Sequence, residues 1–456
     1  TPRGEAELRA VLAAAYAHNV PVTPRGAGTG NYGQAMPLRG GIVLEMTEFN
    51  RVLWAKPGVV RAGAGCKLID LDARLRRDVG GELRFHPSTR RTATLGGFIA
   101  GGSSGIGRTT YGILREPGNI LGLRVVTMEA EPRVLELRGP DIDKANHAYG
   151  TNGVITELEM PLAPAWDWVD VVVSFPTLMG AARFADSFTR MDGVAKKLAC
   201  VVPAPIPQDH FRSWGSRVPA GHAVACLMIA PPFLDILPSL IAAHGGAEVL
   251  REASDAAEVP LYEHSWNHTT LQVLKTDKTI TYLQTLYPAP NHLDLIAKLE
   301  RMFPDEVLPH LEFVRFGGTV CAFGLQIVRF TSEERLNEII RMHEEAGAPI
   351  FNPHAYTLED GGMKRVDETQ LAFKREADPR SRAAGSPVQV QPLDRIPQLQ
   401  IPVDLPGQPP VQPGRQHGVH PAVPQFRMDF RRDPLRLAPP PITARRHVLQ
   451  RARHPT

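Results

Sequence analysis

The chain has 456 residues, 43% hydrophobic and 22% charged, a length and composition that suit a globular protein of two domains. No run of about eighteen apolar residues occurs, so no membrane-spanning helix is expected. The net charge is only +3, and the four cysteines lie far apart without a C-x-x-C spacing, which favours buried thiols in a reducing, cytoplasmic compartment over disulfides or metal sites.

Residues 21–33, PVTPRGAGTGNYG, combine a short apolar strand with a glycine-rich loop. Its four glycines can turn successive N–H groups toward one anion, and Arg25 would add positive charge. The loop lacks the lysine of a P-loop, and a further loop and the strand 42–46 follow it instead of the helix of a dinucleotide-binding motif. From these residues alone, a phosphate cradle and a tight structural turn both stay open.

A second glycine-rich stretch occupies residues 94–112, TLGGFIAGGSSGIGRTTYG. Two such loops could hold one extended ligand between them. The alternative is close packing of backbone in a glycine-rich turn of the core.

Seven short segments then form an ordered set: PVTPRGAGTG (21–30), GIVLEMTEFNRV (41–52), VRAGAG (60–65), HPSTRRTATLGG (86–97), YG (111–112), GNILGLRVVT (118–127) and YGTNGVITEL (149–158). Together they resemble the FAD-binding domain of the vanillyl-alcohol oxidase and p-cresol methylhydroxylase (PCMH) superfamily, which includes glycolate oxidase and D-lactate dehydrogenase flavoproteins. The resemblance implies an FAD-binding domain of the PCMH type, with two subdomains, over residues 1–165. Relatives usually have another strand and turn before this point, so we expect the start at Thr1 to be truncated.

The resemblance also assigns residues to the cofactor. The pyrophosphate, which favours N–H donors, would be wrapped by Arg25, Gly26, Ala27, Gly28, Thr29 and Gly30. The other side of the cofactor would be lined by Pro87, Ser88, Thr94 and Gly97. The flavin and ribityl chain would lie near Gly101 and Ser104, and the adenine would meet the backbone of Gly153, Val154 and Ile155, the last two of which also suit a buried strand. Neither loop contains His or Cys, so we expect non-covalent FAD.

From Trp168 onward, strand and helix patterns alternate, which favours an α+β substrate domain over residues 166–379. The expected strands are 169–175, 223–229 and 279–286, with a hairpin of 311–316 and 320–328 that turns at Gly317-Gly318. The expected helices are 177–190, 233–243, 292–303, 332–346 and 367–377. These units suggest a ferredoxin-like cap, an antiparallel sheet with helices on one face, which the family places over the flavin ring.

Candidate catalytic residues lie in this second domain. His264 and His268 are four residues apart, a spacing open to a metal pair, a substrate contact or a structural role; the chain lacks the family's Gly-Asp-Gly-Asn metal signature, and we assign no metal. His354 stands where glycolate and lactate relatives carry Glu-His-Gly, so it is the leading candidate for a general base, with a capping role as the alternative. Arg315 and Arg329 could bind a substrate carboxylate or could be solvated strand residues.

Residues 380–456 differ in composition from the rest. From residue 381 onward the chain has eleven Arg and 15 of the 42 prolines but no Lys, Glu, Tyr, Trp or Cys, and a charge of +7 against −4 elsewhere. We expect a disordered tail, because such a composition buries little apolar surface. Relatives continue after Asp378-Pro379 with a Gly-x-Leu-Asn-Pro-Gly-Lys segment that is missing here, which favours a shifted reading frame. A native disordered extension and an RNA-binding tail are the alternatives.

The resemblance implies an FAD-dependent oxidoreductase, a dehydrogenase or oxidase that oxidises an alcohol or 2-hydroxy acid by hydride transfer to flavin N5. The expected partners are a small-molecule substrate and an electron acceptor, with no nucleic acid. Oligomeric state and peripheral attachment to a membrane stay unassigned. The alternative function is a flavin-binding module without turnover, because both ends of the chain are altered.

Overall fold

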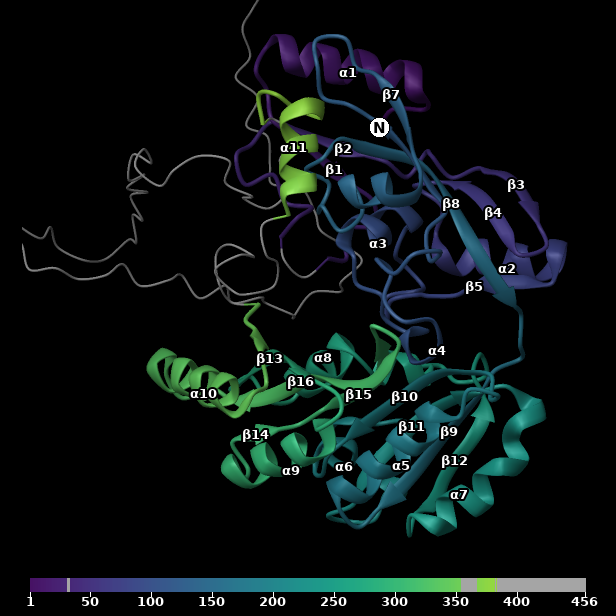
Figure 1. The fold of residues 1–456 in the computed structure, drawn as a ribbon, viewed down its shortest axis with the longest axis vertical. Coiled ribbons are helices and arrows are strands. Elements are labelled where there is room, and N and C mark those ends of the chain that lie inside the picture. Colours follow the sequence, from purple (N-terminus) through teal and green to yellow (C-terminus); the bar gives the residue numbers. More distant parts are fainter. Residues whose placement is uncertain (31–32, 354–366, 382, 384–456) are drawn as a thin grey trace, which may run out of the picture. The chain divides into compact units, whose positions relative to one another are not determined.

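The computed structural model describes residues 1–30, 33–353, 367–381 and 383, and these residues belong to one compact unit. Separate sheets divide the unit into a first lobe, residues 1–165 with 367–381, and a second lobe, residues 166–353 (Figure 1). His354 and nearly all of the predicted tail lie outside the described residues.

The first lobe begins with helix α1 (Glu5–Ala17) and a parallel strand pair, β1 (Val22–Arg25) and β2 (Ile42–Glu45). Its main sheet is antiparallel in the order β3-β4-β8-β6-β7, with β5 paired to β8. These strands are β3 (Val52–Lys56), β4 (Val59–Gly63), β5 (Gly81–Leu83), β6 (Gly122–Val126), β7 (Val134–Leu137) and β8 (Val154–Pro164). The helices between them are α2 (Leu68–Val79), α3 (Leu95–Gly101), α4 (Arg108–Tyr111) and the 3-10 helix η1 (Gly139–Lys144).

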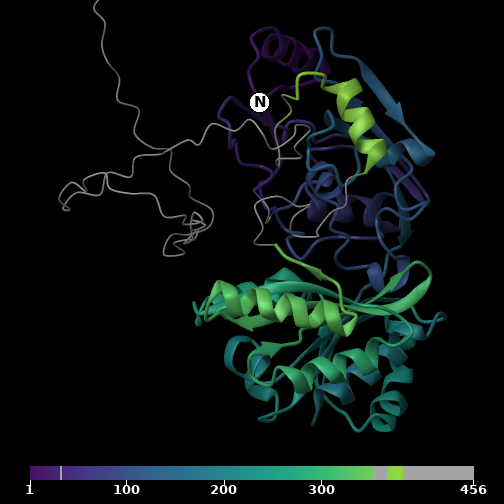
Figure 2. The same cartoon turned by 60° about the vertical axis from the view of Figure 1, so that its left-hand side comes forward.

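A helix from far along the chain completes the core of the first lobe. Phe373 and Ala377 of α11 (Glu368–Ala377) are buried in the same apolar cluster as Leu75 of α2 and Leu158 of β8. The N–H of Met128 donates to the carbonyl of Ala377 at 2.7 Å, and Figure 2 shows α11 lying against this lobe. The structure therefore places α11 with the first lobe, whereas the sequence analysis had put it in the second domain.

The second lobe is one antiparallel sheet of nine strands in the order β12-β9-β11-β10-β15-β16-β13-β17, with β14 also paired to β16. Its strands are β9 (Val169–Phe175), β10 (Lys196–Val202), β11 (Ala223–Ile229), β12 (Ala247–Ala253), β13 (Ile280–Tyr287), β14 (Val307–Leu308), β15 (Leu311–Phe316), β16 (Thr319–Arg329) and β17 (Ile350–Phe351). Its helices are α5 (Leu178–Arg190), α6 (Ile206–His210), α7 (Leu237–Ala243), α8 (Asn267–Leu274), α9 (His292–Met302) and α10 (Glu333–Ala346), with the 3-10 helices η2 (Gly215–Arg217), η3 (Pro231–Ile236) and η4 (Leu261–His264).

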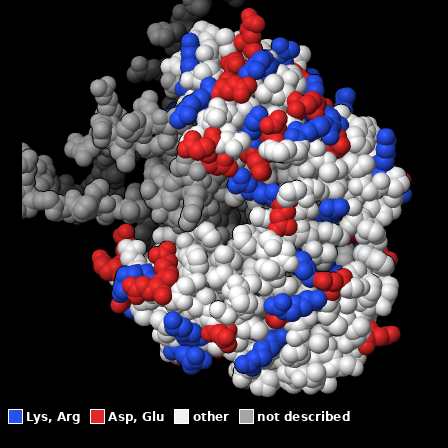
Figure 3. Space-filling model, in the orientation of Figure 1, with Lys and Arg blue, Asp and Glu red and all other residues white. Residues whose placement is uncertain are grey.

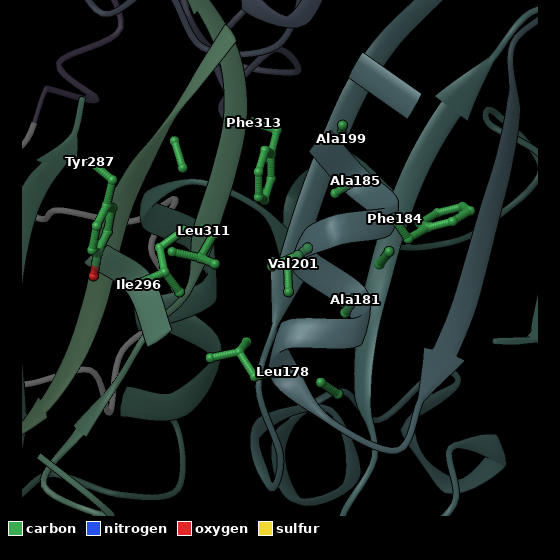
Figure 4. Close-up of a cluster of buried hydrophobic side chains, with 14 of the residues drawn as sticks. Leu178, Ala181, Phe184, Ala185, Ala199, Val201, Tyr287, Ile296, Leu311 and Phe313 are labelled. Atoms are coloured by element: carbon green, nitrogen blue, oxygen red, sulfur yellow. The ribbon is translucent and has the colours of Figure 1, made fainter. Parts of the chain in front are cut away.

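Different elements pack against the two faces of this sheet. On one face, α5, α7, α9 and α10 bury a large apolar cluster (Figure 4). In α5, Leu178, Ala181 and Phe184 recur at helical spacing, which turns one stripe of the helix toward the strands. On the other face, a second cluster includes Ile206 of α6, Val273 of α8 and Ile106 of the first lobe. The expectation of helices on one face therefore holds for α5, α7, α9 and α10, while α6, α8 and the first lobe cover the other face.

Several sets of polar contacts join the lobes, one of them between Arg91 and Glu263 at 3.0 Å. Lys197 of β10 donates to the carboxylate of Glu82 in β5 at 2.7 Å, and the side chains of these residues are 4% and 2% exposed. The indole of Trp168 and the guanidinium of Arg76 also donate to Glu82. Although burial opposes its charge, these cations, Lys197 foremost, hold the pKa of Glu82 below its usual range. Another set lies at α4, where the hydroxyls of Thr109 and Thr110 donate to carbonyls of the second lobe.

Charged side chains of both signs lie close together on the face of the first lobe shown in Figure 3. Many form ion pairs: Arg61 contacts Glu136 at 2.6 Å, and Arg124 contacts Glu5 at 2.6 Å. Surface networks of this kind satisfy the arginines within the chain. Within the described ranges, all four cysteines are buried free thiols, and no helix has the length and apolar character needed to cross a membrane.

Candidate functional site

A cavity of about 470 Å³ opens between the glycine-rich loops of the first lobe and reaches residues of the second. All fifteen residues that the sequence analysis assigned to FAD line it: Arg25, Gly26, Ala27, Gly28, Thr29, Gly30, Pro87, Ser88, Thr94, Gly97, Gly101, Ser104, Gly153, Val154 and Ile155. Because these residues come from well-separated parts of the chain, their meeting around one cavity is a property of the fold. Their contacts to a cofactor stay a prediction.

The two glycine-rich loops pack against each other at Gly26. A Cβ atom added to Gly26 would lie 2.1 Å from Oγ1 of Thr94. The same hydroxyl caps α3 by accepting the N–H of Gly97 at 3.4 Å. Only glycine permits this close approach, so the first loop lies directly beside the start of α3.

Part of the cavity wall on α3 is bare backbone. Gly97 and Gly101 are one turn apart on α3, and both line the cavity. A Cβ on Gly101 would meet nothing nearer than the amide nitrogen of Gln34 at 3.8 Å, and one on Gly97 would meet only Oγ1 of Thr94 at 3.0 Å. By contrast, a Cβ on Gly96 would lie 2.5 Å from that of Ala64 in the core. The cavity face of α3 is thus an open backbone surface.

α11 fixes the loop that precedes β8. The side-chain amide of Asn152 donates to the carbonyl of Gln370 at 3.0 Å, and that of Gln370 donates to the carbonyl of Asn146 at 2.8 Å. Lys374 donates to the carbonyl of Thr151 at 2.6 Å. These contacts hold the backbone next to Gly153, the first of the predicted adenine contacts. This role of α11 was not predicted from the sequence, because helical spacing does not reveal which lobe a helix joins.

The second lobe contributes an aromatic end to the cavity, lined by Trp266, Asn267, His268, Leu271, Gln284, Leu286, Phe316 and Phe323. Trp266 has φ 51° and ψ −144°, a strained conformation for a residue with a side chain. Its N–H donates to Oε1 of the buried Glu312 at 2.7 Å. That oxygen lies 3.0 Å from Nε2 of His310, which in turn lies 3.2 Å from Sγ of Cys200. This buried polar group therefore holds Trp266 in place.

The structure separates the two histidines of the HSWNH segment. His264 is 3% exposed and packs against the rings of Phe211 and Trp214, away from the cavity. His268 lines the cavity, and burial, together with the charge of Lys275, lowers its pKa to about 4. Among the described residues, the group with metal-ligand spacing is Cys200, His310 and Glu312 rather than this pair. His268 is the one of the two that can touch a ligand.

Arg108 also lines the cavity. It is 8% exposed, and its guanidinium carbon lies 4.1 Å from the ring centre of Phe323 and 5.2 Å from that of Trp266. In the sequence, Arg108 is noticeable only as part of the glycine-rich stretch 94–112. Arg108 is buried because the second lobe packs against it, and the local sequence does not indicate that packing.

Comparisons with known proteins agree with this geometry. The family described as FAD binding domain matches residues 1–136. A D-lactate dehydrogenase of Archaeoglobus fulgidus is 33% identical over 40% of this chain and 42% of its own length, and the glycolate oxidase subunit GlcD of Bacillus subtilis is 30% identical over 36% of each chain. The alignments thus span about two fifths of these relatives. The solved structure of alkyldihydroxyacetonephosphate synthase matches with a TM-score of 0.63 at 17% identity, over 84% of this chain and 75% of that one, which supports the fold.

Residues 1–136 thus match an FAD-binding domain, which agrees with the resemblance to the vanillyl-alcohol oxidase and p-cresol methylhydroxylase superfamily. The cofactor of this superfamily domain is FAD, as the sequence analysis predicted, and the fold class is confirmed. The open face of α3 fits such a cofactor, because a long, flat ligand can lie against backbone there. The first loop and α3 would hold the diphosphate, and the loop before β8 would hold the adenine. Non-covalent attachment stays a prediction.

The remaining candidates of the sequence analysis lie elsewhere. Arg315 forms an ion pair with Asp192 and donates to the carbonyl of Thr189, and it does not line the cavity. Arg329 is exposed at the end of β16 and does not line it either. His354 lies outside the described residues, so its role as a base stays a prediction. Neither arginine enters the function proposed below.

Proposed function

We propose that this flavoprotein oxidises an alcohol or 2-hydroxy acid by hydride transfer to flavin N5 and passes the electrons to a separate acceptor. The observation that supports it most is the continuity of the cavity, which joins the fifteen predicted FAD contacts to His268 and the aromatic end of the second lobe. A substrate at that end would lie between the cofactor domain and a titratable side chain.

The residues of the aromatic end suit this chemistry. Bound FAD supplies a two-electron acceptor that takes a hydride from a substrate C–H bond. The hydroxyl proton of the substrate needs a base, and His268, neutral at physiological pH, has a free lone pair for it. Trp266, Phe323 and Leu271 provide apolar walls beside which the body of a substrate could lie.

The named relatives favour the substrate class. Their names describe them as a D-lactate dehydrogenase and a glycolate oxidase subunit, which act on 2-hydroxy acids. Since the alignments cover about two fifths of each relative, we take this class as the first to be tested.

An anaerobic reduction screen tests the proposal. The full chain is purified, reconstituted with FAD and mixed with D- and L-2-hydroxy acids and with primary and secondary alcohols while the flavin absorbance is followed. We expect at least one compound to bleach the flavin, and His268→Asn to slow bleaching by about 100-fold or more with the cofactor retained. A yellow protein that no compound bleaches would instead favour a flavin-binding module without turnover. A protein that stays colourless after reconstitution would contradict both functions.

A further inference from the structure

Arg108 is a buried cation with no ion-pair partner among the residues that the structure describes. Arginine is rarely buried unless it is paired, because desolvating a charge is costly. Arg108 makes no ion pair with any described residue, and its Nε has no hydrogen-bond partner among them. Its neighbours are the rings of Phe323 and Trp266, which stabilise a cation but accept no N–H bond of guanidinium geometry. The donors of Arg108 are therefore available to a ligand in the cavity.

The residues on both sides of Arg108 are hydrogen-bonded to the second lobe. The N–H of Gly107 donates to the carbonyl of Lys197 at 2.9 Å. The hydroxyls of Thr109 and Thr110 donate to the carbonyls of Phe313 at 3.0 Å and Lys196 at 2.6 Å. Both sides of Arg108 are thus tied to strands of the second lobe, and a guanidinium held in this way loses little freedom when it binds a ligand.

The two carboxylates whose charges act on Arg108 accept hydrogen bonds from other groups. Glu312 accepts the N–H of Trp266, and Glu116 accepts the N–H of Gly317 at 3.1 Å. Both act on Arg108 only through space, and burial outweighs them, lowering the pKa of its guanidinium to about 10. The side chain still carries its charge at neutral pH, so the cavity contains a fixed positive charge beside apolar walls.

We propose that Arg108 binds the carboxylate of the substrate inside the cavity, so that the site selects organic acids whose remaining body is apolar. The guanidinium pairs with a carboxylate through two parallel hydrogen bonds. The surrounding Trp266, Phe316 and Phe323 suit an aromatic or branched aliphatic group better than the methyl group of lactate. This inference rests on the proposed function only in calling the bound acid a substrate. Binding of the acid to Arg108 can be measured without turnover.

The test uses two unreactive ligands of the same shape, phenylacetate and phenylacetamide, titrated into the FAD-loaded full chain and followed by the flavin difference spectrum and by calorimetry. We expect the native protein to bind phenylacetate more tightly than phenylacetamide. Arg108→Met should weaken the affinity for phenylacetate by about 10- to 100-fold and change the affinity for phenylacetamide by less than about twofold. Arg108→Lys, which keeps the charge, should fall between the two. Arg108→Met should melt no lower than the native protein, because it removes an unpaired buried charge.

Arg84→Met is the matched control, because Arg84 also stacks on an aromatic ring, that of Tyr111, but does not line the cavity. It should bind both ligands like the native protein. Equal weakening of both ligands by Arg108→Met would show a packing role and overturn the proposal. Loss of FAD or a shifted flavin potential with phenylacetate affinity unchanged would show that Arg108 faces the cofactor, and would overturn it too. Arg108-dependent acid binding without bleaching by any hydroxy acid would refute the proposed oxidation while supporting this site.

Discussion

His268 and Arg108 line the cavity from different lobes, and we expect His268 to be neutral and Arg108 to be charged at neutral pH. Burial lowers the pKa of both, but the imidazole becomes neutral at physiological pH while the guanidinium stays charged. A neutral base and a fixed cation at one end of a cavity are what an anionic alcohol substrate would require. These two side chains therefore determine the chemistry of the site. The pH dependence of flavin reduction can test whether His268 is the base.

We predict that the rate of flavin reduction is nearly constant between pH 6 and 8 and is halved near pH 4. The reason is that the pKa of His268 is lowered from about 6.5 to about 4, so its basic form persists well into the acid range. Stopped-flow reduction at saturating substrate measures the profile. An acid limb near pH 6.5 that His268→Asn leaves in place, but His354→Ala removes, would transfer the role of base to His354.

The control for this profile is the melting temperature at each pH. Because the folded state holds His268 in its neutral form, protonation of the unfolded chain lowers stability as the pH falls below about 6.5. Rates are compared only where the FAD-loaded protein remains folded.

At the scale of single elements, α3 decides whether the cofactor fits. Gly97 and Gly101 both line the cavity, and a side chain on Gly101 would extend into open space. We predict that Gly101→Leu reduces FAD affinity by about 100-fold or more, since its branched side chain would occupy the cofactor's place, while the apoprotein melts within a few degrees of the native one. Gly193→Ala, at a position with open space away from the cavity, is the control. FAD affinity unchanged by Gly101→Leu would mean that the cofactor does not lie against α3.

Elements whose ends are marked by turn or capping residues in the local sequence were predicted well. The hairpin of β15 and β16 turns at Gly317 and Gly318, both with positive φ, and α10 begins with a hydrogen bond from the N–H of Arg335 to the Ser332 hydroxyl. β10 was missed, because its buried Lys196 and Lys197 look like surface residues until their partners in other elements are known. The cofactor loops were found from glycine patterns, whereas Arg108 was not, since its surroundings come from the second lobe.

At the scale of the whole molecule, the site depends on how firmly the lobes are joined. The cavity has walls from both lobes, and the Glu82–Lys197 pair lies in their junction together with Trp168 and Arg76. A buried pair of this kind is not necessarily better than an apolar contact, but removing one partner leaves the other charge buried and less compensated. The junction is therefore sensitive to single substitutions.

We predict that Lys197→Met lowers the free energy of unfolding by about 3–5 kcal/mol at pH 7, because Glu82 keeps its charge and loses the more deeply buried of its two paired cations. Urea unfolding followed by tryptophan fluorescence measures the change, with Lys298→Met, an exposed lysine on α9, as the control. The double variant Lys197→Met/Glu82→Gln should recover part of the loss, since the uncompensated charge is gone. A double variant as unstable as Lys197→Met alone would assign the loss to packing.

The same pair predicts how acid acts on the native protein. Lys197 and Arg76 hold the folded-state pKa of Glu82 below its ordinary value of 4.5, so the stabilisation is complete above that value and disappears as the pH falls through the lowered folded pKa. Lys197→Met should raise this pKa and lose less stability on acidification, so the gap between the two proteins should narrow from pH 5 to pH 3. Urea midpoints at intervals across that range test the prediction, and a gap that stays constant or widens would show that the ion pair does not hold the lobes together.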